Sequence, residues 1–188
     1  PVVDKLATEC AGKVKIGTTS RGIGPCYEDK ISRRGLRIAD LLNTESFPSR
    51  FRSIAEEKNT IATALEIHEP WDIDAIVKEY REYAEKLRPF VTDTIHLVNQ
   101  AINSGSRMLF EGAQGTMLDI DHGTYPFVTS SNATAGGICT GVGVSPLHIH
   151  GIIGIAKAYA TRVGGGPFAS EAHGDEGEAL RKAGQEFG

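Results

Sequence analysis

Two segments rich in glycine and hydroxyl side chains place the strongest constraint on how this chain can fold. The hydroxyl loop is residues 16–25 (IGTTSRGIGP), and the central loop is residues 111–143 (EGAQGTMLDIDHGTYPFVTSSNATAGGICTGVG). Both carry small and hydroxyl residues where a core element would carry branched aliphatic side chains, so both are predicted to be loops. Such loops present N–H and O–H groups to an anion, usually a phosphate. The sequence therefore predicts a binder of nucleotide phosphates.

Helical patterns alternate along the chain with short apolar runs. Helices are predicted at 2–10, 27–42, about 50–67 and 74–103. Pro89 is expected to kink the last helix or to divide it in two, and Gly105 to end it. Strands are predicted at 13–16, 108–110 and 152–159. This alternation is typical of an α/β protein, so we predict a central, largely parallel sheet flanked by helices.

The composition excludes several classes of protein. The 188 residues, 40% hydrophobic and 23% charged, are those of a soluble globular domain. A net charge of −4 gives no electrostatic reason to expect nucleic acid as a partner. No run approaches the ~20 apolar residues of a membrane helix. With no basic-then-apolar leader and three cysteines without metal-like spacing, we expect a cytoplasmic protein with reduced thiols.

The hydroxyl loop carries Thr18, Thr19 and Ser20 beside Gly17. Their hydroxyls can donate to phosphate oxygens, whereas a Gly-x-Gly pattern alone is weak evidence because ordinary turns need glycine. The loop lacks the Gly-Lys-Ser/Thr ending of a Walker loop, and no dinucleotide-binding Gly-x-Gly-x-x-Gly follows a strand here.

A basic cluster follows the hydroxyl loop and consists of Lys30, Arg33, Arg34 and Arg37. Most of it is expected to be a solvated helix face. Arg33 is the exception, because a guanidinium fork suits bidentate recognition of a phosphate. It could reach the site of its own subunit or that of a second subunit.

The central loop carries two further candidates. Gln114 lies between two glycines just after an apolar run, where its amide can donate and accept as a purine edge requires. A loop Gln that caps the backbone is the alternative. Thr129 opens the run 129–137 (TSSNATAGG), which is either a second phosphate or ribose contact or a flexible linker.

Three other features are less informative. Asp119, Asp121 and His122 resemble a metal site, but such residues are common in loops, and the metal interpretation is the weaker one. The triple-glycine turn, residues 161–167, carries Arg162, which is either structural or turned toward the same pocket. No Gly-x-Ser-x-Gly elbow supports a serine hydrolase.

Three long strings together resemble the adenylosuccinate synthetase family over nearly the whole chain. They are residues 22–33 (GIGPCYEDKISR), 110–137 (FEGAQGTMLDIDHGTYPFVTSSNATAGG) and 157–171 (KAYATRVGGGPFASE). The resemblance implies a P-loop-NTPase-like fold, incomplete here. Residues 1–188 would be the central part of one domain, with a helical insertion at about 27–105.

The resemblance also implies a reaction and a set of site residues. Members of the family join IMP and L-aspartate, using GTP and Mg²⁺, to give adenylosuccinate, GDP and phosphate in purine biosynthesis. The purine 6-oxygen is phosphorylated and then displaced by the aspartate amine. By similarity, Thr19 and Thr129 contact the IMP phosphate and Gln114 lies at the hypoxanthine end. Arg33 contacts the phosphate from the partner subunit of a homodimer.

The chain departs from the family pattern in what it lacks. The amino-terminal Gly-Asp-Glu-Gly-Lys loop, with its catalytic aspartate, is absent, as is the nearby catalytic histidine; Asp175-Glu176-Gly177 does not replace that loop. The aspartate-binding arginine loop and the guanine-binding part are also absent. We therefore assign no catalytic residue and no metal ligand within the chain, expect Mg²⁺ ligands outside it, and predict that the 188 residues alone are inactive.

Two rival functions remain open. One is a P-loop kinase or GTPase, which would need a Walker loop. The other is a non-catalytic nucleotide-binding or dimerisation module.

Overall fold

The computed structural model describes residues 17, 19–64 and 71–186. The chain forms two compact units, one of residues 1–25 with 94–188 and the other of residues 26–93. The helix expected at 2–10 and the strand expected at 13–16 lie outside the described residues.

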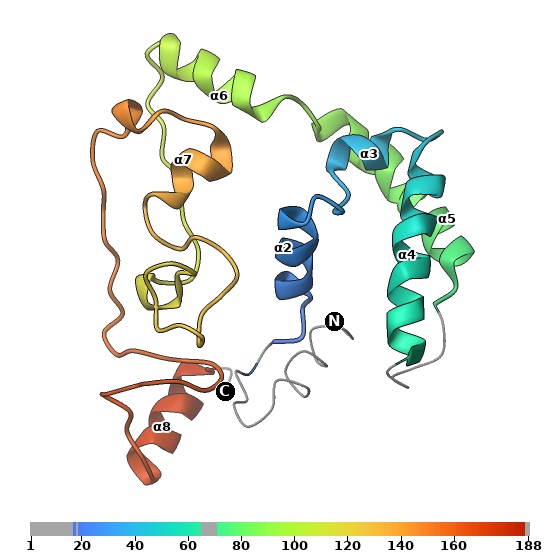
Figure 1. Cartoon of the computed structure of the whole chain (residues 1–188). Coiled ribbons are helices and arrows are strands. Elements are labelled where there is room, and N and C mark those ends of the chain that lie inside the picture. Colours follow the sequence, from blue (N-terminus) through green and yellow to red (C-terminus); the bar gives the residue numbers. More distant parts are fainter. Residues whose placement is uncertain (1–16, 18, 65–70, 187–188) are drawn as a thin grey trace. The chain divides into compact units, whose positions relative to one another are not determined.

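The unit of residues 26–93 is helical (Figure 1). It contains most of α2 (Ile23–Ile31), then α3 (Ile38–Leu42), α4 (Phe47–Ala64), α5 (Ile73–Leu87) and the single 3₁₀ turn η1 (Arg88–Phe90). Helices α3 and α4 both pack against α5. This unit overlaps the helical insertion expected at about 27–105.

A small apolar core holds these helices together. Its buried residues are Leu41, Phe47, Val77 and Ala84. Phe47 is 1% exposed and its ring lies 5.8 Å from that of Phe51. The side chain of Ala84 on α5 is small and fully buried, which allows neighbouring helices to pack closely against α5. Burial of apolar side chains is the main source of stability in such a unit.

The helix boundaries follow local sequence signals. Asp72 caps α5, since its carboxylate accepts a hydrogen bond from the Ala75 N–H at 2.9 Å. The predicted break at Pro89 is confirmed, because α5 ends at Leu87 and Pro89 lies in η1. The single helix predicted at 27–42 is instead two, α2 and α3, separated by a turn at residues 32–37.

The other unit contains α6 (Thr94–Asn103), η2 (Thr116–Leu118), α7 (Gly137–Val142), η3 (Pro146–His148) and α8 (Asp175–Gly184). Helix α6 contacts α7, and Asn99 Nδ2 donates to the Gly143 carbonyl at 3.0 Å. The predicted stop at Gly105 is confirmed, since its φ of +76° ends the helical path. Within the described part of the chain, no helix is long and apolar enough to cross a membrane.

The predicted α/β fold with a central parallel sheet is wrong for the described residues, which contain no strand. Residues 108–110 and 152–159 are non-helical, but no backbone hydrogen bond joins them to another described segment. Leu109, Ile153 and Ile155 are 86%, 84% and 94% exposed. An apolar run of strand-like composition becomes a strand only when a neighbouring segment satisfies its N–H and C=O groups.

Candidate functional site

The hydroxyl loop contacts the triple-glycine turn through two glycines. Gly17 has φ +78°, and a Cβ atom placed on it would lie 2.8 Å from Gly164 Cα. Both the left-handed backbone and this close approach require glycine. Thr19 follows two residues later and is exposed, while Thr18 lies outside the described residues. The contact brings the backbone next to Thr19 close to the triple-glycine turn.

Arg162 joins the triple-glycine turn to the central loop. Its Nη2 donates to the Phe127 carbonyl at 2.7 Å and to Thr124 Oγ1 at 3.1 Å, and its Nε donates to the Gly165 carbonyl at 3.0 Å. Gly166 packs under this guanidinium, since a Cβ atom there would lie 2.5 Å from Arg162 Nη2. Of the two interpretations left open by the sequence, Arg162 has the structural one: it cross-links two loops.

Asp119 organises the interior of the central loop. Its side chain is fully buried, and its two carboxylate oxygens accept hydrogen bonds from four backbone N–H groups, those of Asp121, His122, Ala133 and Thr134. Burial alone would raise the pKa of this carboxyl, but the four donors outweigh burial and lower the pKa from 3.8 to about 2. Asp119 is therefore ionised at neutral pH and holds distant parts of the loop together.

Thr129 lies on the segment that Asp119 secures. Its N–H donates to the Leu118 carbonyl at 2.8 Å, and the Ile120 N–H donates to the Ser131 carbonyl at 3.2 Å. The Thr129 hydroxyl is 3.5 Å from that of Ser131. The residue is partly buried, and its backbone N–H bond to Leu118 fixes the segment that carries the hydroxyl.

Gln114 occupies a strained backbone position in the same unit. Its φ is +62°, in the left-handed region that non-glycine residues rarely adopt. The residue is exposed and is followed by Gly115 and then η2, whose Leu118 accepts the Thr129 N–H. Strained positions of this kind cluster at functional sites.

The two aspartates of the central loop, Asp119 and Asp121, serve loop hydrogen bonds. All four Asp119 contacts are backbone amides, and Asp121 Oδ2 accepts from Asn132 Nδ2 at 2.7 Å. The part of the chain that the structure describes holds no group of three His, Cys, Asp or Glu side chains arranged for a metal ion. Sequence reasoning missed the role of Asp119, because nothing in a local pattern identifies amide partners 14 and 15 residues away.

Arg33 belongs to the other compact unit, where it lies in the turn after α2. Its φ is +62°, its side chain is exposed, and its N–H donates to the Lys30 carbonyl at 3.1 Å. The next two N–H groups, of Arg34 and Gly35, both donate to the Asp29 carbonyl at 2.9 and 3.0 Å. The turn closes helix α2 and presents Arg33 to solvent.

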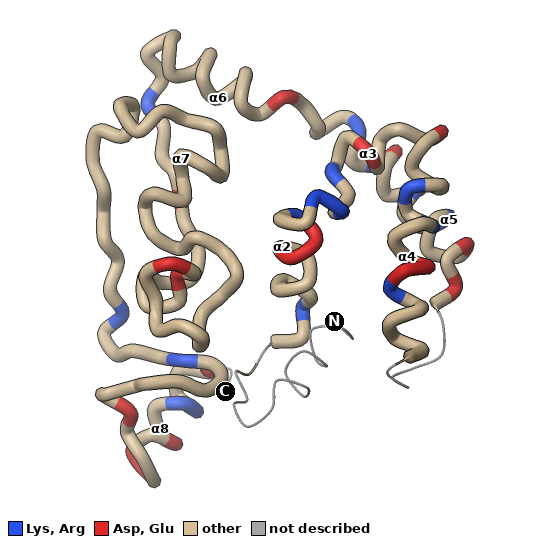
Figure 2. Tube along the Cα trace, viewed as in Figure 1, with Lys and Arg blue, Asp and Glu red and all other residues tan. Residues whose placement is uncertain are grey.

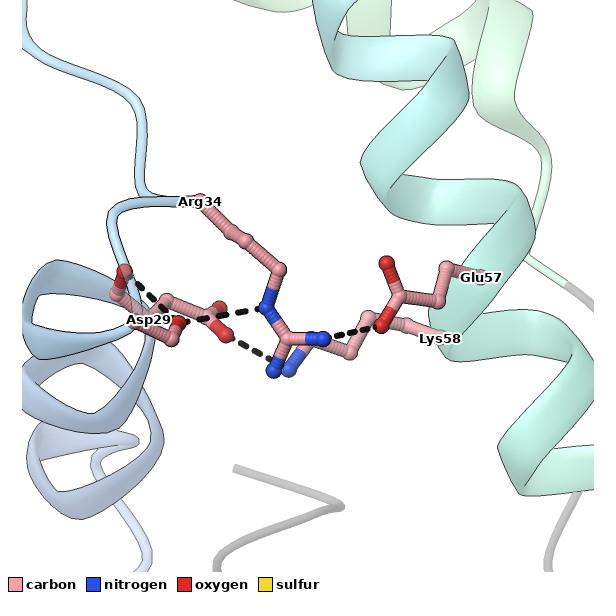
Figure 3. Close-up of polar contacts among 5 residues, drawn as sticks. Asp29, Arg34, Glu57 and Lys58 are labelled. Carbon is pink, nitrogen blue, oxygen red and sulfur yellow. Dashed lines mark hydrogen bonds and ion pairs between the residues drawn. The ribbon is translucent and has the colours of Figure 1, made fainter.

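Two ion pairs join α2 and the turn after it to α4 (Figure 3). Lys58 Nζ lies 2.8 Å from Asp29 Oδ1, and Arg34 Nη1 lies 2.5 Å from Glu57 Oε1. Figure 2 shows Lys and Arg gathered on the segment from the end of α2 to α3. Arg34 is exposed, as expected of a solvated face, and its guanidinium also bridges the turn to α4 through Glu57. Its neighbour Arg33 is likewise exposed.

Known proteins resemble the chain over its whole length. The sequence profile of the adenylosuccinate synthetase family matches residues 1–188. The chain is 60% identical over 187 residues to the adenylosuccinate synthetase of Solibacter usitatus and 61% identical over 185 residues to that of Koribacter versatilis. These alignments cover 100% and 98% of the chain but 43% and 42% of the relatives.

A solved structure agrees with the sequence comparisons. The structure of fully ligated adenylosuccinate synthetase from Plasmodium falciparum matches 100% of the chain and 44% of its own length, with a TM-score of 0.90 and 38% identity. The chain thus spans less than half the length of the relatives that it matches. The family match over all 188 residues leads to one conclusion: the chain belongs to the adenylosuccinate synthetase family.

Proposed function

We propose that this chain forms the IMP-binding part of a ligase that joins IMP and L-aspartate with GTP, giving adenylosuccinate, GDP and phosphate. The observation that carries the proposal is the linkage of three Gly-rich segments within one unit. Gly17 lies against Gly164, and Arg162 connects that turn to Thr124 and Phe127. Loops joined in this way can direct several hydroxyl and N–H groups toward one anion.

The proposed roles divide by chemistry. The hydroxyls of Thr19 and Thr129 donate to the phosphate of IMP, and the Gln114 amide pairs with the hypoxanthine edge. The exposure of Thr19 and Gln114, the fixed position of Thr129 and the left-handed backbone of Gln114 support these roles. Each charge-assisted hydrogen bond from a threonine hydroxyl to the phosphate contributes roughly 1.5–3 kcal/mol.

Arg33 has its proposed role in a homodimer, where it contacts the phosphate bound by the partner subunit. Its exposure supports this role, and the Arg34–Glu57 and Lys58–Asp29 ion pairs stabilise the turn that carries it against α4. A planar guanidinium matches two phosphate oxygens at once.

Mg²⁺ would neutralise phosphate charge in the reaction, but the described residues do not fit it. Asp119 accepts four backbone hydrogen bonds and Asp121 accepts one from Asn132, and the part of the chain that the structure describes holds no group of three His, Cys, Asp or Glu side chains that could hold a metal ion. As the resemblance to the family implies, we place the Mg²⁺ ligands and the catalytic acid–base groups outside the 188 residues and propose that these residues alone are inactive. The setting we propose is the cytoplasm.

Titration calorimetry of IMP against the 188-residue chain tests the binding role. We expect Thr129→Ala to weaken IMP at least tenfold, because one phosphate donor is lost. Thr140→Ala is the matched control, since Thr140 lies on α7, is exposed, and donates its hydroxyl to the Gly137 carbonyl of the same helix. Equal IMP affinity of Thr129→Ala and the wild-type chain would refute the assignment of Thr129.

A chimera tests the enzymatic role. This chain replaces the matching region of the Solibacter usitatus relative, to which it is 60% identical. We expect adenylosuccinate to form with the chimera and not with the 188-residue chain. A folded chimera without turnover would refute the ligase proposal.

We propose a non-catalytic nucleotide-binding or dimerisation module as the second candidate. Sedimentation of the chain with and without IMP separates the two. A dimer that does not bind IMP would favour the module.

A further inference from the structure

We propose that Asp119 is a positioning residue, which holds the central loop in the shape that binds IMP. This proposal rests on the proposed function of the loop. Asp119 does not itself contact the nucleotide in this scheme, since its carboxylate oxygens are already occupied by backbone donors within a fully buried pocket of the loop.

The two carboxylate oxygens divide the loop between them. Oδ1 accepts from the N–H groups of Asp121 at 2.9 Å and His122 at 3.0 Å, close to Asp119 along the chain. Oδ2 accepts from those of Ala133 at 2.6 Å and Thr134 at 3.1 Å, across the loop. One side chain therefore closes a local turn with one oxygen and joins the far side of the loop with the other.

An ionised carboxylate is the side chain whose two oxygens can both act as acceptors here. Asparagine has one carbonyl oxygen, and its NH₂ group would point at two N–H donors. Because Asp119 is fully buried, water does not replace the missing acceptor, and buried unsatisfied N–H groups are destabilising. The depressed pKa of Asp119, about 2, agrees with acceptance of four donors by the charged form.

Thr129 lies between the two parts of the loop that Asp119 connects. Its N–H is bonded to the Leu118 carbonyl, next to Asp119, and four residues later the Ala133 N–H is bonded to Asp119 Oδ2. The segment 129–133 is thus anchored at both ends. Loss of the hydrogen bond to Asp119 Oδ2 frees the Ala133 end of this segment. The Thr129 hydroxyl is then no longer pre-positioned for a phosphate.

The test compares Asp119→Asn with Asp121→Asn in the 188-residue chain. Asp121 is the control because it lies in the same loop, is exposed, and accepts one hydrogen bond from the Asn132 side chain. Amide hydrogen exchange and IMP titration are measured on both. In Asp119→Asn the NH₂ group faces one of the two amide pairs, either Asp121 and His122 or Ala133 and Thr134. We expect at least tenfold faster exchange at that pair and at least tenfold weaker IMP binding. Asp121→Asn should change neither by more than about twofold.

Saturating IMP provides the readout that distinguishes positioning from general stabilisation. If Asp119 acts through the phosphate-binding shape of the loop, IMP should restore slow exchange at the amide pair that Asp119→Asn releases, because ligand binding selects the ordered loop. Faster exchange with unchanged IMP affinity would overturn the proposal, as would wild-type exchange.

Two further outcomes concern the binding of IMP by the wild-type chain and the folding of Asp119→Asn. If the wild-type chain does not bind IMP but Asp119→Asn releases the amides, the hold of Asp119 on the loop stands and the proposed function fails. If Asp119→Asn does not fold, Asp119→Glu is measured in its place. Glutamate keeps both carboxylate oxygens but moves them one methylene further from the backbone. Wild-type exchange and wild-type affinity in Asp119→Glu would then overturn the proposal.

Discussion

Lys58 Nζ lies 2.8 Å from Asp29 Oδ1, and the two side chains are only 16% and 18% exposed. This pair joins α2 to α4 at a point where water is largely excluded. Removal of one partner would leave a poorly solvated charge, which is more costly than the loss of an exposed pair. The pair therefore stabilises the position of the turn that carries Arg33.

Substitution Lys58→Met should lower the free energy of unfolding of the helical unit by about 2–3 kcal/mol, somewhat less than for a fully buried pair. Urea unfolding followed by fluorescence measures it, because Trp71 is the single tryptophan and lines the same cavity as Lys58. Arg52→Met is the control: it breaks the exposed pair with Asp74 and should cost less than about 1 kcal/mol. Equal effects of the two substitutions would contradict the prediction.

Substitution Arg33→Gly should separate stability from binding. Glycine adopts a φ of +62° without strain, so the turn should gain up to about 1 kcal/mol in free energy of unfolding. The chimera should at the same time bind IMP at least tenfold more weakly, because the guanidinium is lost. Trp71 fluorescence and IMP titration check the two effects. A stabilised variant with unchanged IMP affinity would exclude Arg33 from the site.

Substitution Gly17→Ala should disturb the contact between the hydroxyl loop and the triple-glycine turn. The new Cβ would lie 2.8 Å from Gly164 Cα on a left-handed backbone, so the two segments must separate. We expect IMP affinity to fall at least fivefold in titration calorimetry. Gly141→Ala is the control, since no atom lies within 4 Å of its Cβ position in α7, and it should leave affinity unchanged. Wild-type affinity in Gly17→Ala would show that the contact is dispensable.

Acid should loosen the central loop over a defined range of pH. The pKa of Asp119 is lowered from 3.8 to about 2, so the folded loop binds fewer protons than the unfolded loop in this interval. Its stabilising effect is fully present above about pH 4 and is lost as the pH falls toward 2. The amide signals of Ala133 and Thr134 in nuclear magnetic resonance spectra should report this loss. In Asp119→Asn the same amide signals should lack this pH dependence. If the pH dependence persists in that variant, a titratable group other than Asp119 causes it.

Local sequence signals determined several helix boundaries but not every element, since the segment 111–143 predicted as a loop contains η2 and α7. Pro89 cannot continue an α-helix and ends α5, while Gly105 adopts the left-handed backbone that ends α6. The family could also be recognised from the sequence, because its three long strings are contiguous along the chain. Each of these signals depends on neighbouring residues only.

Only the tertiary structure decided which distant groups meet. Residues 152–159 have the composition of a strand, yet strand formation depends on a partner segment, and the described residues provide none. Asp119 finds the amides of Ala133 and Thr134, and Arg34 finds Glu57, 23 residues away. Hydrogen bonds and ion pairs act over a few ångströms in space, and the sequence alone does not specify which residues the folded chain brings within that range.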